Sequence, residues 1–275
     1  MPDLRESVTS VGIEFDVPSG LLADALDYLD AGTEPRVTAQ IAALEAAIGT
    51  SQEVSWPNDD VRFQLLALLG TVPAARFWFA AQGISPEIAE ASLADLTPKL
   101  RDYGIAATGI DWLAKVVTCG VFVLGRLQFE PAGVDRAWDT HIPESGPLDP
   151  VACDESFTRA VSFFRGRGDT TTNAFACHSW LLDDQLAEYL PADSNILRFA
   201  RRFTLTDTAE ADAPVDSAEG GGATEGDRAV AKFVFRRPLA ELSAITPATT
   251  LERATLAHLA AGRHWRERSG VLRLP

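Results

Sequence analysis

The amino-acid sequence predicts an α+β fold, with a helical N-terminal half packed on a mixed β-sheet supplied by the C-terminal half. Over residues 1–110 apolar side chains recur at helical spacing. From about residue 113 the pattern changes to short runs rich in β-branched and aromatic residues, separated by loops with Pro and Gly. We therefore expect two domains, 1–110 and 111–275, that share one interface.

The helices of the first half follow from their apolar spacing and their end residues. Periodicity predicts three helices, over 17–31, 37–48 and 59–70. Pro73 is expected to begin a separate segment. Ser85 and Pro86 form a typical helix start and Gly104 a typical helix end, so another helix is expected over 86–103.

The second half is expected to alternate strands and helices. Strands are predicted at 116–123, 126–129, 139–143, 175–182, 196–205 and 229–235. Helices are predicted at 150–166, 183–190 and 249–261. Asp149 and Pro150 suit the N-cap and first position of the first of these helices. The chain then closes with a short apolar tail at 271–274.

Residues 207–228 are predicted to form a disordered acidic loop. The stretch 207–227 holds seven acidic residues and no basic one, and three glycines follow one another at 220–222. Such a composition buries too little apolar surface to offset the entropy of ordering.

Composition excludes several function classes. The chain has 275 residues, 46% of them hydrophobic and 23% charged, as is typical of a soluble globular protein. A net charge of −15 argues against nucleic-acid binding. The N-terminus does not resemble a signal peptide and no apolar run is long enough to span a bilayer, so we expect a cytoplasmic protein that does not contact a membrane. The three cysteines and four histidines lack metal-site spacing, so no metal is expected.

Three polar clusters interrupt the apolar segments of the second half. They are His141–Asp149, Cys177–Trp180 and Ser194–Phe199. Polar and ionisable side chains are unusual between strand-like segments, so a site is expected there. Arg126 and Gln128 lie on one face of their strand by alternation, which indicates a polar groove.

The second half also resembles a known family. Its order of strands and helices is similar to the core of the GNAT N-acetyltransferases. More specifically, it resembles the GNAT-like C-terminal domain of bacterial proteins labelled acyltransferase, which follows a helical GNAT-like N-terminal domain. The runs that carry the resemblance are Gly125–Glu130, His141–Leu148, Cys177–Leu182 and Ser194–Ile196. The similarity covers roughly 110–275, and 1–110 only by its helical character.

The resemblance implies acyl-CoA as co-substrate and transfer of the acyl group to an amine or similar small-molecule acceptor by direct attack. It places the CoA-binding loop at 144–149, and it assigns CoA contacts to Ser145, Gly146, Leu148 and Asn195. This loop departs from the GNAT pattern. It has one glycine, a proline, and acids at both ends, so the helix that follows offers fewer N–H groups to a phosphate.

Four residues are candidates for acid–base chemistry. The resemblance puts His141 and His178 on strands that diverge around the acyl group, where either could be a general base. Each could instead be a structural histidine. Glu144 could act as a base through a water or be a solvated loop acid. Tyr189 stands where GNAT enzymes often place a tyrosine that protonates the departing thiolate, although a packing role is the alternative.

Substrate contacts are predicted for Arg126, Gln128, Ser179 and Trp180. Cys177 lies on the opposite strand face from its neighbour His178, which favours a buried thiol over a nucleophile.

Two hypotheses therefore remain. One is an acyl-CoA-dependent acyltransferase, which the His, Glu and Tyr candidates favour. The other is a catalytically silent GNAT-like module that binds a small molecule or a protein partner, which the atypical loop favours. A hydrolase acting through Cys177 or Ser179 lacks an elbow motif, and the oligomeric state stays open.

Overall fold

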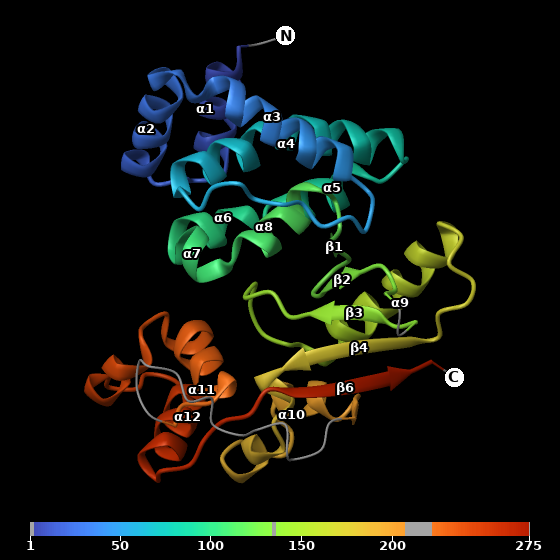
Figure 1. The fold of residues 1–275 in the computed structure, drawn as a ribbon. Helices are drawn as coiled ribbons and strands as arrows, with labels where there is room; N and C mark the ends of the chain where they lie inside the picture. Colours follow the sequence, from blue (N-terminus) through green and yellow to red (C-terminus); the bar gives the residue numbers. More distant parts are fainter. Residues whose placement is uncertain (1–2, 134–135, 207–221, 275) are drawn as a thin grey trace. The chain divides into compact units, whose positions relative to one another are not determined.

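The computed structural model describes residues 3–133, 136–206 and 222–274. The chain divides into two compact units, Met1–Val123 and Leu124–Pro275 (Figure 1). The first unit is helical and the second is built on a mixed sheet, so the α+β prediction is confirmed.

Helices account for nearly all of the first unit. In chain order they are α1 (Leu4–Glu14), α2 (Ser19–Tyr28), α3 (Glu34–Ala47), α4 (Val61–Ala81), α5 (Pro86–Leu93), α6 (Leu96–Pro98), α7 (Gly104–Thr108) and α8 (Ile110–Val117). The start at Ser85 is confirmed, because its hydroxyl accepts a hydrogen bond from the backbone N–H of Ile88. The predicted strand at 116–123 is wrong over most of its length: α8 occupies its beginning, and only β1 (Phe122–Val123) is a strand.

Helix α4 is the core of the first unit. It continues through Pro73, so the predicted break there is wrong. Burial explains the continuity: α1, α2 and α3 all pack on α4, and this tertiary packing outweighs the cost of one proline. By length and composition alone α4 could cross a membrane. Its leucines at 65, 66, 68 and 69 are fully covered by protein.

The second unit carries most of the sheet. Its elements are β2 (Gln128–Glu130), β3 (Trp138–His141), α9 (Pro150–Gly166), β4 (Ala174–Ser179), α10 (Asn195–Ala200), β5 (Thr204–Leu205), α11 (Glu225–Val230), α12 (Thr250–Ala260) and β6 (Arg268–Arg273). The strand order is β1-β2-β3-β4-β6-β5. β3 and β4 are parallel, whereas the pairs β2–β3, β4–β6 and β5–β6 are antiparallel. Asp149 caps α9 as predicted, since its carboxylate accepts the N–H of Ala152.

Four predictions for this unit are corrected. The strand at 196–205 is mostly α10, which the Ser194 hydroxyl caps, and only β5 remains a strand. The strand at 229–235 is helical, because Thr224 and Asp227 form a capping box that starts α11. That box also shows that the end of the predicted disordered loop is ordered, and both of its residues are buried. Residues 207–221 of that loop lie outside the described residues. The true last strand is β6, where only a tail was expected.

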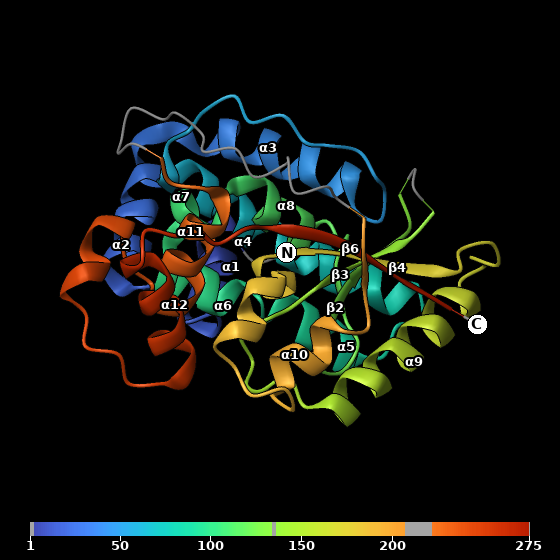
Figure 2. The same ribbon diagram turned by 90° about the horizontal axis from the view of Figure 1, so that it is seen from below.

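The sheet of the second unit has one aromatic face. Phe129, Trp138 and Phe175 alternate onto this face. They pack against Phe157 and Phe164 of α9, with ring centroids 4.8 Å apart for Phe157–Phe175 and 5.3 Å apart for Trp138–Phe164. α9 and α10 lie beside each other along the strands (Figure 2).

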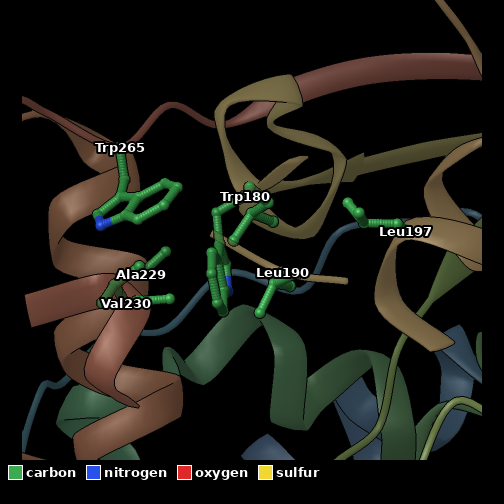
Figure 3. Packing of buried hydrophobic residues seen from close by; sticks show 8 residues of the cluster. Trp180, Leu190, Leu197, Ala229, Val230 and Trp265 are labelled. Carbon is green, nitrogen blue, oxygen red and sulfur yellow. The ribbon is translucent and has the colours of Figure 1, made fainter. Parts of the chain in front are cut away.

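A second hydrophobic cluster joins the helices that follow the strands. Its centre is the pair of indoles Trp180 and Trp265, whose ring centroids are 6.3 Å apart. Ala229 and Val230 of α11 lie beside Trp265 (Figure 3). Gly226 permits this packing, because a Cβ there would lie 2.4 Å from the Trp265 backbone.

Candidate functional site

The two parallel strands separate where the candidate histidines stand. β3 and β4 pair only at Trp138–Phe175 and Asp139–Ala176. Beyond these pairs β3 continues to His141 and β4 to Ser179. Ligands typically bind outside the carboxyl ends of adjacent parallel strands. Both histidines therefore lie in a position suited to binding.

His178 is the centre of a three-residue hydrogen-bonded chain. Its Nε2 lies 2.8 Å from Oε2 of Glu267, and its Nδ1 lies 2.9 Å from Oγ of Ser269. The register of β4 with β6 sets this geometry, because His178 and Ser269 are direct cross-strand partners. The His178 side chain is 61% exposed, so the chain of three is open to solvent.

His141 forms a second pair with a carboxylate. Its Nε2 lies 2.8 Å from Oε1 of Glu130 on the neighbouring strand β2. Gln128, which is directly opposite His141, points to the same sheet face and is buried. This face of the sheet thus carries two separate histidine–carboxylate pairs.

The side chain of Arg126 forms hydrogen bonds to the backbone of the predicted CoA-binding loop. Its guanidinium donates to the carbonyl oxygens of Pro143, Gly146 and Pro147, over 2.7–3.0 Å. Burial lowers the pKa of Arg126 from its ordinary value. The structure therefore gives Arg126 a role in fixing the loop, and its predicted substrate contact stays a prediction.

Two further arginines stand at the ends of this loop. Arg236 pairs with Glu144 at 2.8 Å. Arg202 pairs with Asp154 and donates to the carbonyl oxygen of Pro150 in the first turn of α9. Together with Arg126, they place three guanidinium groups around one loop and one helix start.

The remaining loop residues have different environments. Ser145 and Gly146 are exposed, and Gly146 has a φ of +97°, a left-handed conformation that glycine adopts readily. Leu148 is buried. Asn195 is the first residue of α10, and no contact of its side chain tests the predicted link to CoA.

Tyr189 belongs to a buried network apart from the polar strand face. Its hydroxyl lies 3.1 Å from Nδ1 of His258, which is fully buried, and its ring packs against Trp265. Burial lowers the pKa of His258, and the nearby charge of Arg263 acts in the same direction. This environment is that of a packing residue, and the predicted role as proton donor to a thiolate stays a prediction.

The other candidates on β4 have structural surroundings. The hydroxyl of Ser179 accepts the N–H of Leu181 and so caps a short 3₁₀ turn. Trp180 is a core residue. Cys177 points to the aromatic face, opposite His178, and burial raises its pKa to about 12. Substrate contacts of Ser179 and Trp180 stay predictions.

Sequence reasoning missed the residues that complete the histidine pairs. Glu267 and Ser269 are 89 and 91 residues away from His178 in the chain. Glu130 was not among the predicted site residues. The three consecutive polar residues at 267–269 were the available signal of a polar site. They lie directly before the segment that was expected to be a short tail. Within the described residues no group of three or more potential metal ligands occurs.

Comparisons with known proteins agree with this fold. The sequence model of the GNAT-like C-terminal domain matches residues 121–272. Similar solved structures include an acyltransferase in complex with decanoyl-CoA and teicoplanin, at 31% identity and a TM-score of 0.76. Another is an acyltransferase in complex with CoA and 10C-teicoplanin, at 30% identity and a TM-score of 0.74. A third is an acyltransferase mutant in complex with octanoyl-CoA, at 30% identity and a TM-score of 0.75. Each match covers 98% of this chain and 88% of the other.

No curated protein matches the sequence. The family match spans more than half of the chain, and the structural similarity extends over almost all of it. The chain belongs to the GNAT-like acyltransferase family and carries its GNAT-like C-terminal domain.

Proposed function

We propose that the protein transfers an acyl group from acyl-CoA to an amine-bearing small molecule by direct attack of the amine on the thioester. The observation that carries the proposal is the His178–Glu267 pair beside the point where β3 and β4 separate. Similar solved structures are acyltransferases in complex with acyl-CoA, which supports the same co-substrate here.

In this proposal His178 is the general base. The carboxylate of Glu267 can only accept, so the hydrogen bond at 2.8 Å requires a proton on Nε2 of His178. The lone pair of the neutral ring is then on Nδ1. Glu267 also stabilises the imidazolium that forms when the base takes a proton. A base positioned in this way typically contributes roughly 10²–10⁴-fold to a rate.

The Arg126-braced loop is the proposed CoA contact. Three guanidinium groups favour an anionic ligand, and arginine suits phosphate oxygens because of its planar fork of donors. Two of the three already pair with carboxylates, so binding a phosphate there would draw Arg236 from Glu144 or Arg202 from Asp154. The dipole of α9 adds to the same electrostatic preference at the start of the helix, where Asp149 already accepts the N–H of Ala152.

The acceptor is the least constrained part of the proposal. Teicoplanin is bound in one of the similar acyltransferases. It is therefore the first acceptor to test, with decanoyl-CoA as donor. A panel of simple primary amines, with matched alcohols as controls, then defines whether the nucleophile is nitrogen or oxygen.

The test has a binding arm and a turnover arm. Calorimetric titration with CoA and decanoyl-CoA should give saturable binding, tighter for the acylated form if the acyl chain is recognised. Incubation with donor and acceptor should release CoA thiol and yield an acceptor heavier by one acyl group. Absence of binding would refute the proposal. Binding without release of CoA for any acceptor would instead support the silent binding module.

A further inference from the structure

The hydroxyl of Ser269 completes the hydrogen-bonded chain on the polar face of the sheet. With Nε2–H of His178 donated to Glu267, the Nδ1 lone pair of the neutral ring points at Ser269 Oγ, 2.9 Å away. Ser269 must therefore be the donor in this bond. The lone pair that would remove a proton from an acceptor is already occupied by a serine hydroxyl.

The position of Ser269 is fixed by the backbone on both sides. It pairs directly with His178 across β4 and β6. Its carbonyl oxygen accepts the N–H of Thr206 at 2.9 Å, next to the β5–β6 pairing. A serine anchored in two ladders cannot swing away from the ring without a change in its side-chain rotamer. Direct contact between an acceptor and Nδ1 would require that change.

From this arrangement we infer that Ser269 is a proton relay between the acceptor and His178. This inference rests on the proposed acyl transfer. As the amine nitrogen forms its bond to the thioester carbon, one N–H proton passes to Ser269 Oγ, while the serine hydroxyl proton passes to His178 Nδ1. The carbon–sulfur bond then breaks and the thiolate takes up the proton from His178. The products are an amide and CoA thiol, and Ser269 and His178 return to their starting states.

The experiment compares Ser269→Ala and Ser269→Thr with wild type, and uses Ser162→Ala as control. Ser162 is exposed on α9, where its hydroxyl donates to the backbone carbonyl of Thr158 in the same helix. For each protein, kcat and KM for decanoyl-CoA are measured by CoA release, and the rate is followed in mixtures of light and heavy water. Intact-mass spectra are recorded with decanoyl-CoA and no acceptor.

The relay predicts that Ser269→Ala lowers kcat, by up to roughly 10²–10⁴-fold, and leaves KM and unfolding temperature unchanged. Ser269→Thr, which keeps the hydroxyl, should retain most of the rate. Wild type should show a curved dependence on the heavy-water fraction, because two protons move together. The dependence in Ser269→Ala should be linear. A purely structural serine would not change the curvature.

Three outcomes overturn the relay. If wild type turns over and Ser269→Ala equals it, the relay alone is wrong. If wild type acquires one acyl mass on Ser269, the serine is a nucleophile and the transfer is not direct. If wild type releases no CoA with any acceptor, the proposed function fails and the relay fails with it.

Discussion

The two faces of the sheet in the second unit differ in almost every respect. One is aromatic: Phe175 is fully buried and touches the rings of Phe129, Trp138 and Phe157. The other carries two histidine–carboxylate pairs, one of them built on His178, which is largely exposed. Phe175 and His178 are three residues apart on the same strand, so strand alternation alone separates the packed aromatic face from the face that carries the candidate site.

This comparison teaches where substitutions should act. Changes on the aromatic face remove packing and should lower the free energy of unfolding. Changes on the polar face alter exposed hydrogen bonds and should affect turnover with little effect on stability. The substitutions below each change side chains of one region, and the measurements compare the effects on stability, turnover and solvent access.

The largest effect is expected from Phe175→Ala. The side chain is fully buried among three rings, so its removal leaves a cavity that costs about 3–5 kcal/mol. Urea unfolding of the variant and of His178→Asn, on the opposite face of β4, measures the contrast. Equal stability of the two variants would show that the faces are not divided in this way.

Glu267→Gln should reduce turnover, but by a smaller factor than His178→Asn, which removes the proposed base. The amide oxygen can still accept from His178 Nε2, but the charge that stabilises the imidazolium is gone. We expect a lower kcat with unchanged KM for decanoyl-CoA. Glu241→Gln is the matched control, because Glu241 is exposed and its carboxylate pairs with Arg237, four residues earlier. An unchanged kcat would remove Glu267 from the mechanism.

Because His258 is buried, we expect the stability of the buried network around it to fall at acidic pH. Burial lowers its pKa and the charge of Arg263 acts in the same direction, whereas the hydrogen bond to the His264 carbonyl and the charges of Asp183 and Glu188 oppose this shift. The unfolded chain then binds more protons than the native one below the ordinary histidine pKa of about 6.5, so stability is complete above that pH and is lost as the pH falls. His258→Gln should weaken this dependence and, by disturbing the bond to Tyr189, cost about 1–3 kcal/mol. Identical pH profiles for the two proteins would contradict the assignment.

The smallest expected effect is on thiol reactivity. Burial raises the pKa of Cys177 to about 12 and also raises that of Cys153, so both thiols are protonated near neutral pH. Neither should react with a thiol reagent in the native protein, and both should react in urea. Phe175→Ala should speed the reaction of Cys177 if the aromatic side chains of this face keep the reagent away from the thiol. Fast labelling of native Cys177 would show that this face is open.

Much of the fold could be predicted because local signals were strong. Ser85 and Asp149 are caps with a side-chain oxygen at the right position, and both start the predicted helices. The strand predictions at 196–205 and 229–235 failed because their β-branched and aromatic residues were given more weight than the caps in front of them. Ser194 and Thr224 direct both segments into helices.

The candidate site could be predicted only in part. His178 was proposed from local sequence as a polar residue in a strand-like run, and its role in a site stays a prediction. Its partners Glu267 and Ser269 depend on the register of β4 with β6, which is a long-range pairing that local patterns do not encode. The substrate contact expected of Arg126 stays a prediction. Its hydrogen bonds to three carbonyl oxygens of the 143–147 loop depend on the folded position of that loop, which local sequence does not encode.

The most direct test of the account is the effect of His178→Asn on CoA release and on binding of decanoyl-CoA, measured with the same preparation. The account predicts that turnover falls by roughly 10²–10⁴-fold, because the general base is lost. It also predicts that the dissociation constant for decanoyl-CoA and the unfolding curve stay those of wild type. Turnover equal to that of wild type would contradict the assignment of the polar face as the active one.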